Sequence, residues 1–203
     1  MTIDKSRVLA FLADTVETVL MSLALFLVIY IFVVQPHQVN GHSMDPTLQT
    51  GEYLLTEKLS YRFSQPARGD IIVFRAPKVA CATGDCDYIK RIIGMPGDTV
   101  QIVEGHFMVN NQLLDEAQYL PNGVMTNPGF YTQDEQVVVL GENEYFVSGD
   151  NRPGSSDSRI WGPINRKDIV GRAIFSYWPI ATFGVIEQGD LSMVTVTSSA
   201  ATD

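Results

Sequence analysis

The sequence predicts a mainly β protein, an antiparallel β domain of sandwich or barrel type tethered by one N-terminal transmembrane helix. Residues 18–34 carry no charged side chain. After Pro36, short runs rich in Val, Ile, Phe and Tyr alternate with Gly, Pro, Asn and Asp. No helical pattern separates these runs, which favours an antiparallel over a parallel sheet. The 203 residues, 45% of them hydrophobic, suffice for one packed domain beside the helix.

The uncharged segment has the properties of a membrane anchor. Its 17 residues would form a helix of roughly 25 Å, which reaches across the hydrocarbon core with help from flanking residues. A buried core helix and a cleavable signal peptide are the alternatives. A signal peptide would be followed by a small-x-small site, whereas Q-P-H-Q-V-N-G-H follows here.

Basic residues near the two ends predict the orientation of this helix. Lys5 and Arg7 precede it, and the first basic residue after it is Lys58. The positive-inside rule then places the N-terminus in the cytoplasm. We expect a cytoplasmic N-terminus (residues 1–15), an anchor helix (16–35), an extracytoplasmic β domain (36–187) and a flexible C-terminal tail (188–203).

The β domain should contain several short strands joined by tight turns. Glu104-Gly105 and Asn110-Asn111 are typical of hairpin turns. The candidate strands are residues 52–58, 70–75, 87–93, 99–103, 106–109, 136–140, 144–148 and 169–177.

Charge and cysteine usage exclude some classes of partner. A net charge of −9 argues against nucleic acid, because nothing here could neutralise a run of phosphates. Cys81, Cys86 and three scattered histidines are too few ligands for a metal site, and we expect neither a metal nor a cofactor. Cys81 and Cys86 could form a small disulfide in an oxidising compartment or remain free thiols.

Two segments contain residues that could perform chemistry together. Ser43 lies in G-H-S-M-D-P-T-L, just after the anchor, where a turn serine is the simplest interpretation. Lys90 lies in D-Y-I-K-R-I-I-G, and in a strand it shares a face with Tyr88 and Ile92. Its ammonium group could extend to water, or it could be buried, with its pKa lowered from about 10.4 toward 7–8 so that it acts as a base. His42 is a poor alternative base, because adjacent side chains diverge in an extended chain.

Three motifs and a fourth segment give the chain a resemblance to the type I signal peptidases. G-H-S-M-D-P-T-L resembles the family's serine motif, and Y-I-K-R-I-I-G-M-P-G-D resembles its lysine motif. G-D-N-R-P-G-S-S-D-S-R resembles its third signature, and R-G-D-I-I-V-F also matches. The four occur in the family's order after an N-terminal anchor, over roughly residues 15–178.

The resemblance implies a β fold whose apolar rim lies against the membrane. It also implies that the chain is anchored in a bacterial cytoplasmic membrane. It implies that Ser43 is the nucleophile and Lys90 the general base, a pair known to replace the Ser-His-Asp triad. Supporting roles fall on Gly149, Asp150, Asn151, Ser155, Asp157 and Arg159, with Ser155 orienting Lys90 and Asp157 pairing with Arg159. The substrates would be exported preproteins, cleaved after small-x-small sequences such as Ala-x-Ala. The implied substrate-binding residues are Val39, Gly41, Met44, Leu48, Tyr88 and Ile89.

Gly41 departs from those family members that carry a serine there to bind the oxyanion. We expect Gly41→Ser to be tolerated and to be able to raise the rate, since one oxyanion donor is worth about 10²–10³-fold elsewhere. Two other functions remain as alternatives. A self-cleaving repressor of the SOS type would need an N-terminal DNA-binding domain in place of the apolar helix. A membrane-tethered, non-enzymatic binding or envelope protein would have no special use for Ser43 and Lys90.

Overall fold

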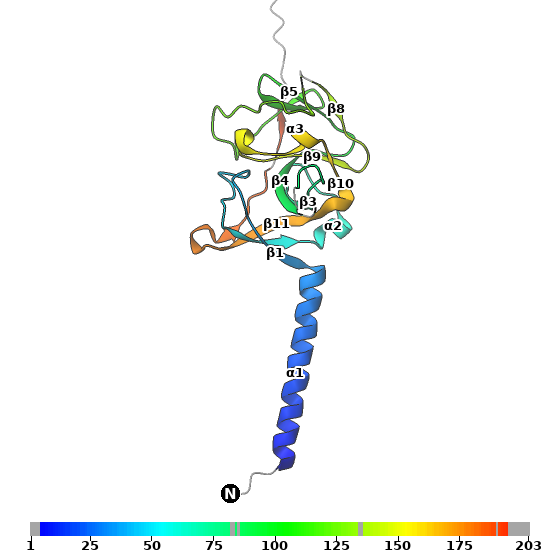
Figure 1. Ribbon diagram of the computed structural model, residues 1–203, viewed down its shortest axis with the longest axis vertical. Helices are drawn as coiled ribbons and strands as arrows, with labels where there is room; N and C mark the ends of the chain where they lie inside the picture. The colour runs from blue at the N-terminus through cyan, green and yellow to red at the C-terminus, as the bar shows by residue number, and fades with distance from the viewer. Residues whose placement is uncertain (1–4, 82–83, 85, 134–135, 190, 195–203) are drawn as a thin grey trace, which may run out of the picture.

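The computed structural model describes residues 5–81, 84, 86–133, 136–189 and 191–194. It consists of one long helix, α1 (Lys5–Phe32), and a β domain in which every strand pair is antiparallel (Figure 1). The predicted fold class is therefore confirmed: mostly antiparallel β-sheet, arranged as a half-barrel, with one apolar N-terminal helix.

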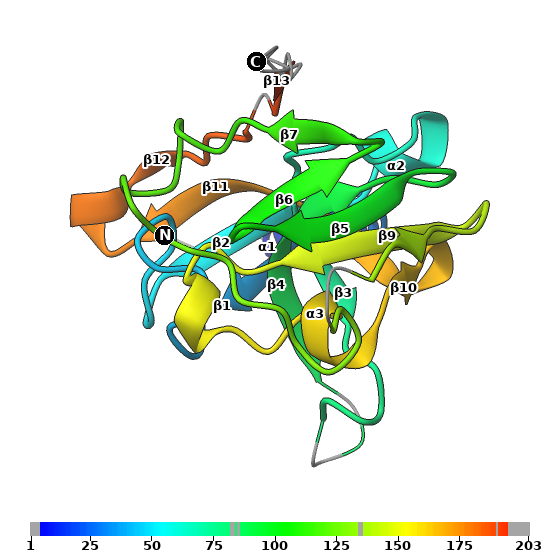
Figure 2. The same cartoon turned by 90° about the horizontal axis from the view of Figure 1, so that it is seen from above.

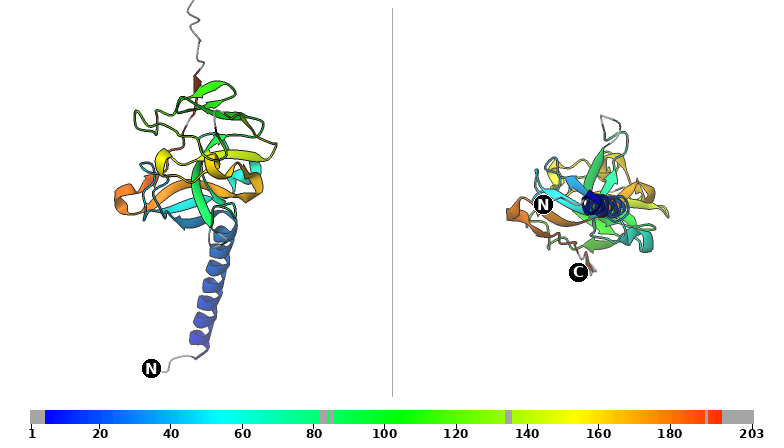
Figure 3. Two further views of the ribbon diagram at one scale, coloured as in Figure 1. Left: turned by 45° about the horizontal axis from the view of Figure 1, so that its top comes forward. Right: turned by 90° about the horizontal axis from the view of Figure 1, so that it is seen from below.

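Helix α1 begins at Lys5 and ends at Phe32, whereas the predicted anchor helix spans residues 16–35. It contains one segment long and apolar enough to cross a membrane, Ser6–Phe32, with a mean hydropathy of 2.2. The large apolar side chains along it are exposed, and Figure 3 shows the helix standing clear of the β domain. A helix that is apolar all round and exposed along most of its length is suited to lipid. It ends at Phe32 because the chain then enters a strand at Val34.

The larger sheet has eight strands in the order β1-β2-β11-β3-β4-β9-β10, with β12 beside β11. Its strands are β1 (Val34–Gln38), β2 (Tyr53–Glu57), β3 (Ile71–Arg75), β4 (Asp87–Gly94), β9 (Glu144–Ser148), β10 (Ile164–Asn165), β11 (Ile169–Trp178) and β12 (Gly184–Val185). The helical turns around it are α2 (Ser60–Phe63), η1 (Arg152–Gly154), α3 (Ser158–Trp161), η2 (Arg166–Asp168) and η3 (Ile180–Thr182).

The smaller sheet has five strands in the order β13-β7-β6-β5-β8 and lies at the end of the domain away from α1 (Figures 1 and 2). Its strands are β5 (Thr99–Val103), β6 (His106–Val109), β7 (Gln112–Leu114), β8 (Val138–Val139) and β13 (Met193–Val194). The two predicted hairpin turns are confirmed, because Glu104, Gly105, Asn110 and Asn111 have φ values of 49°, 81°, 53° and 61°.

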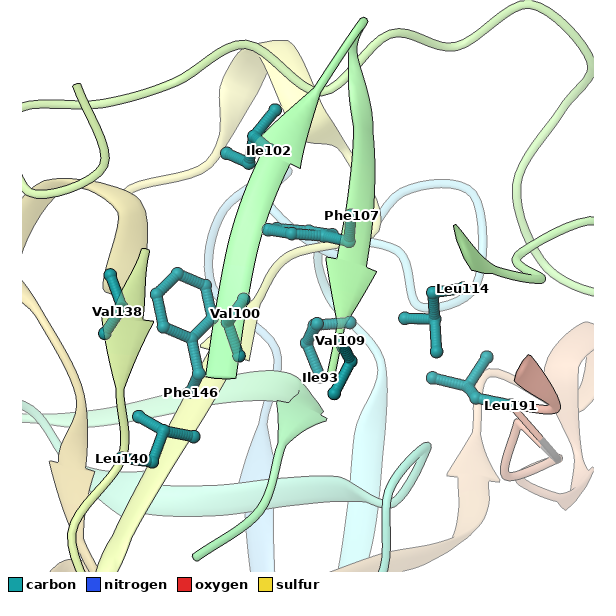
Figure 4. Close-up of a cluster of buried hydrophobic side chains, with 10 residues drawn as sticks. All are labelled: Ile93, Val100, Ile102, Phe107, Val109, Leu114, Val138, Leu140, Phe146 and Leu191. Carbon is teal, nitrogen blue, oxygen red and sulfur yellow. The ribbon is translucent and has the colours of Figure 1, made fainter. Parts of the chain in front are cut away.

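Three apolar clusters hold the sheets together. The first lies between the two sheets (Figure 4) and includes Phe107 and Phe146, whose ring centroids lie 5.8 Å apart. The second lies inside the larger sheet around Phe74 and Tyr145. The third lies beneath the segment that carries Ser43.

The predicted flexible tail is in part ordered. Ile71 N donates to Gln188 Oε1 at 2.7 Å, Leu191 is buried in the first cluster, and β13 pairs with β7. The sequence did not predict these contacts, because a single buried leucine and a single hydrogen-bonded glutamine in a polar segment give no periodic pattern. Residues 195–203 lie outside the described part of the chain.

Candidate active site

The segment from Gly41 to Leu48 forms a turn-rich loop between β1 and β2, here called the serine loop. Its buried side chains Met44 and Leu48 belong to the third cluster and fix it from below. From the side, Asn151 N donates to Ser43 O at 3.1 Å and Asn151 Nδ2 donates to His42 O at 2.9 Å. The third motif therefore positions the backbone of the serine motif.

Strand β4 brings Lys90 to Ser43. Lys90 Nζ lies 2.7 Å from Ser43 Oγ and 2.9 Å from the Ile89 carbonyl oxygen. The Lys90 side chain is only 3% exposed, and its Nζ lies 5.2 Å from the centre of the Tyr88 ring. Of the two alternatives for this lysine, the structure shows the buried one.

Burial changes the acidity of this lysine. Desolvation lowers the pKa of Lys90 from 10.5 to about 8, with Arg159 adding to that effect and the charges of Asp157 and Asp150 opposing it. A buried lysine that is partly neutral near pH 8 can accept a proton from a hydroxyl group that touches it. In the described part of the chain, no histidine bonds Ser43; His42 Nδ1 faces Asp45 Oδ2 at 3.0 Å instead.

Asp150 ties the three motifs together behind the serine loop. Its carboxylate accepts from Arg91 Nε at 2.9 Å and Arg91 Nη2 at 2.8 Å, and from Thr47 Oγ1 at 2.6 Å. Thr47 belongs to the serine motif and Arg91 to the lysine motif. Sequence reasoning named Asp150 but missed Arg91 and Thr47. The D-Y-I-K-R run could have indicated Arg91, since its strand face is shared with Ile89 and Ile93.

Asp157 and Arg159 form the pair that the resemblance implies. Arg159 donates to Asp157 through Nε at 2.8 Å and Nη2 at 2.7 Å. Burial acts to raise the pKa of Asp157, but bonding to Arg159 and to the Gly149 amide outweighs burial, and the pKa is lowered. Asp157 also accepts from Ser148 Oγ at 3.1 Å, which joins α3 to the end of β9.

Arg152 is not among the residues that sequence reasoning named. It is 2% exposed and bonds Glu116, Thr126 Oγ1 and the carbonyl oxygen of Gly149. These contacts connect the site to the loop that follows β7. We call the pairs Arg91–Asp150, Arg152–Glu116 and Arg159–Asp157 the arginine network.

Gly149 and Ser155 lie at the closest approach of the third motif to the serine loop. A Cβ atom at Gly149 would lie 2.2 Å from Ser43 O and 2.3 Å from Ser155 Oγ, so only glycine fits. Ser155 Oγ is buried close to the Asp157 carboxylate, whose pKa it helps to lower, and has no other hydrogen-bond partner within the described residues. It does not bond Lys90 in this structure, although the resemblance implies that it orients that side chain.

A cleft of about 290 Å³ opens beside Ser43 and Lys90. Val39, Met44, Tyr88 and Ile89, all named from the resemblance, line it. Leu48 does not line it, because its side chain packs into the third cluster beneath. The remaining lining residues are Gln38, Asn40, Gly41, His42, Asp87, Gly154 and Ser156.

Gly41 has a φ of 106°, which side chains rarely adopt, although no atom lies within 4 Å of the place a Cβ would occupy. The strain argues against the expected tolerance of Gly41→Ser. The Ser43 amide donates to no group in the described part of the chain, so it is free to bind an oxyanion.

The remaining expected features lie around the cleft. The structure joins Cys81 to Cys86 through their sulfur atoms, in the hairpin that leads into β4. Tyr88 Oη donates to the Ala80 carbonyl oxygen at 2.6 Å, which links that hairpin to the cleft. No group of three or more His, Cys, Asp or Glu side chains among the described residues could hold a metal ion.

The chain matches the family model described as "Signal peptidase, peptidase S26" over residues 12–178. It is 38% identical to "Signal peptidase I" of Leptolyngbya laminosa over 176 residues, covering 85% of this chain and 83% of that protein. It is 34% identical to "Signal peptidase IB" of Staphylococcus aureus, covering 84% of this chain and 93% of that protein. It is also 38% identical to "Probable thylakoidal processing peptidase 2, chloroplastic" of Arabidopsis thaliana, covering 71% of this chain and 38% of that protein.

Proposed function

The chain belongs to the S26 signal peptidase family of serine endopeptidases, and we propose that it removes signal peptides from exported preproteins with a Ser43–Lys90 dyad. The observation that carries the proposal is the 2.7 Å contact between Lys90 Nζ and Ser43 Oγ at a buried, cleft-lining position.

The proposed chemistry follows from the environment of Lys90. With a pKa of about 8, roughly one tenth of the lysine is neutral at pH 7. The neutral amine takes the proton of Ser43, whose Oγ attacks the scissile carbonyl carbon and forms an acyl-enzyme. The protonated lysine then gives its proton to the leaving amine, and a water molecule activated by the neutral lysine releases the acyl group. The Ser43 amide would receive the developing oxyanion. Ser155 Oγ, buried beside the Asp157 carboxylate, would orient Lys90 in this mechanism.

The cleft suits an extended peptide with small side chains. Asp87–Arg91 pair with β3 along one edge of β4, whereas β9 pairs with β4 only from Arg91 onward. The other edge of residues 87–90 therefore faces the cleft with backbone groups that a substrate strand could pair with. Val39, Met44 and Ile89 make the adjoining wall apolar, which favours a methyl group over a polar or bulky one. These features support cleavage after small-x-small sequences.

We further propose that α1 anchors the chain in the membrane, with the β domain on the side away from Lys5 and Arg7. A bacterial cytoplasmic membrane is the expected location. The thylakoid membrane is the second candidate, on the name of the Arabidopsis relative. A reporter active only outside the cytoplasm should be active when fused after residue 188, and a cytoplasm-only reporter should not.

Peptide cleavage in detergent tests the proposed activity. The full chain should cut a synthetic peptide with an Ala-x-Ala site after the second alanine, and Ser43→Ala should not. Ser156→Ala is the matched control, because Ser156 lines the same cleft and has no assigned role in the chemistry. Cleavage by Ser43→Ala at the wild-type rate would rule out Ser43 as the nucleophile.

A further inference from the structure

A basic and apolar patch lies beside the end of α1, outside the site and the four matching motifs. It is formed by Lys58, Leu59, Arg62, Phe63 and Arg166, and we call it the α2 patch. Leu59 is 38% exposed and Phe63 is 84% exposed, at the start and end of one helical turn. Arg166 lies over the Tyr61 ring and donates to the Tyr61 carbonyl oxygen, which brings a third cation to this turn.

The α2 patch is attached directly to the upper end of α1. Lys58 Nζ donates to the Ile31 carbonyl oxygen at 3.4 Å, and the Arg62 guanidinium lies 5.2 Å from the centre of the Phe32 ring. Figure 1 shows α2 at the level of β1, where the helix meets the domain. These contacts fix the height of the patch relative to the helix.

That height corresponds to the headgroup region of a bilayer. The segment Ser6–Phe32 has 27 residues and measures about 40 Å, longer than a hydrocarbon core of about 30 Å. Asp14 and Glu17 favour a position toward the lower headgroups for the first part of α1. Ile31 and Phe32 then lie near the upper boundary, and the side chains that touch them lie among lipid headgroups.

The charge of the α2 patch is opposite to that of the whole chain. The net charge is −9, yet Lys58, Arg62 and Arg166 gather here with no ion pair within the described residues. The carboxylate of Glu57 begins the turn and accepts a hydrogen bond from Ser60 N at 2.6 Å. Three cations with a phenylalanine pointing outward fit an anionic lipid surface.

We propose that the α2 patch docks on anionic lipid headgroups of the membrane that α1 crosses, with Phe63 entering the acyl boundary. This inference rests on the proposed anchoring. It is separate from the apolar rim, formed by Tyr53, Trp178, Ile180, Phe183 and Val185, because the rim lies at the other end of β2 and has no cation. Tyr53 and Glu57 are four residues apart in β2, or about 14 Å. Docking at both ends of β2 would fix the tilt of the domain, and so the height of the cleft above the bilayer.

Photo-crosslinking to lipid tests the proposal on the full chain. Benzoylphenylalanine replaces Phe63, and the protein is placed in nanodiscs of phosphatidylcholine alone or of phosphatidylcholine mixed with anionic phosphatidylglycerol. We expect several-fold more lipid adduct in the anionic discs. The adduct should fall about fivefold in Lys58→Gln/Arg62→Gln and again at high salt.

Gln101→Glu/Gln112→Glu is the matched control, because it makes the same change in net charge on the smaller sheet, far from α1. It should leave the adduct unchanged. The proposal would be overturned by equal amounts of adduct in neutral and anionic discs, or by equal amounts in Lys58→Gln/Arg62→Gln and its parent. Absence of any lipid adduct would also overturn it. Peptide cleavage in the same discs reports on the proposed peptidase function separately, since Ser43→Ala abolishes cleavage without altering the adduct.

Discussion

Lys90 and Arg91 are neighbours in β4, and each has a buried cationic group, but the surroundings of the two groups differ. Arg91 meets the Asp150 carboxylate through two nitrogen atoms, as part of the arginine network. Lys90 has no carboxylate bonded to it; its Nζ touches a hydroxyl and a carbonyl oxygen. A paired arginine stays charged and holds loops together, whereas an unpaired lysine loses affinity for its proton. The network therefore provides rigid support, whereas Lys90 in the cleft is a cation whose charge can change.

The largest effect should come from removing either member of the dyad. Ser43→Ala, Lys90→Ala and the double variant should each lose about 10³-fold or more in kcat/KM, with nearly equal residual rates, because the two groups act as a unit. Lys90→Arg should be as inactive, since a guanidinium cannot give up its proton at working pH. A Lys90→Ala enzyme that keeps a tenth of the wild-type rate would contradict the dyad.

Stability should respond with opposite sign in the two regions. Arg152→Met leaves Glu116 buried without its partner and should cost about 3–5 kcal/mol, measured by urea unfolding at pH 7. Lys90→Met should instead stabilise by up to about 3 kcal/mol, because folding lowers the pKa of Lys90 from 10.5 to about 8.

The sign of the stability change in Lys90→Met depends on whether the folded or the unfolded chain binds the lysine proton more tightly. The unfolded chain binds it more tightly, so wild-type stability should rise with pH between about 8 and 10.5, and this rise should be missing in Lys90→Met. The double variant Glu116→Leu/Arg152→Met should recover much of the loss of the single variant. Destabilisation of equal size by Arg152→Met and Lys90→Met would refute the contrast between the two regions.

Gly149→Ala should reduce kcat/KM by about 10²-fold, because displacement of the serine loop by about 1 Å costs that much in other enzymes. The new methyl group would overlap Ser43 O and Ser155 Oγ. Gly184→Ala is the control, since nothing lies within 4 Å of its Cβ position and its φ is not in the positive range. Wild-type kcat/KM in Gly149→Ala would show that the contact between the third motif and the serine loop does not set the geometry.

The smallest expected effect concerns the pH at which kcat/KM stops rising. In the proposed mechanism neutral Lys90 is the base, so kcat/KM should rise tenfold per pH unit below about 8 and level off above it. The measurement is kcat/KM on one peptide from pH 6 to pH 10. An inflection near 6.5 would point to a histidine, and one near 10.5 would mean that Lys90 is not buried in the working enzyme.

Parts of the fold were predictable because they follow from local pattern. Residues 99–103 and 106–109 alternate in polarity around Glu104-Gly105, and strands β5 and β6 have those bounds. Strand β13 and the buried Leu191 could not be predicted, because a two-residue strand exists only through its partner β7. Strand β1 was hidden in the same way, since V-Q-P-H-Q has no strand pattern and the strand is distinguished only by its pairing with β2.

Residue identity and motif order determined which side chains to consider: Ser43, Lys90, and the polar run from Gly149 to Arg159. They also determined the apolar helix and the family. Only the tertiary structure decided that Lys90 is buried without a bonded carboxylate while Arg91 is buried with one. The alternation of a strand predicts which side chains share a face, but it does not predict which groups pack against that face. The tertiary structure also placed Leu48 beneath the cleft, fixed Gly41 at a φ of 106°, and brought three basic side chains to the end of α1. Distances, burial and pKa depend on groups that are far apart in sequence, and so they arise only when the chain folds.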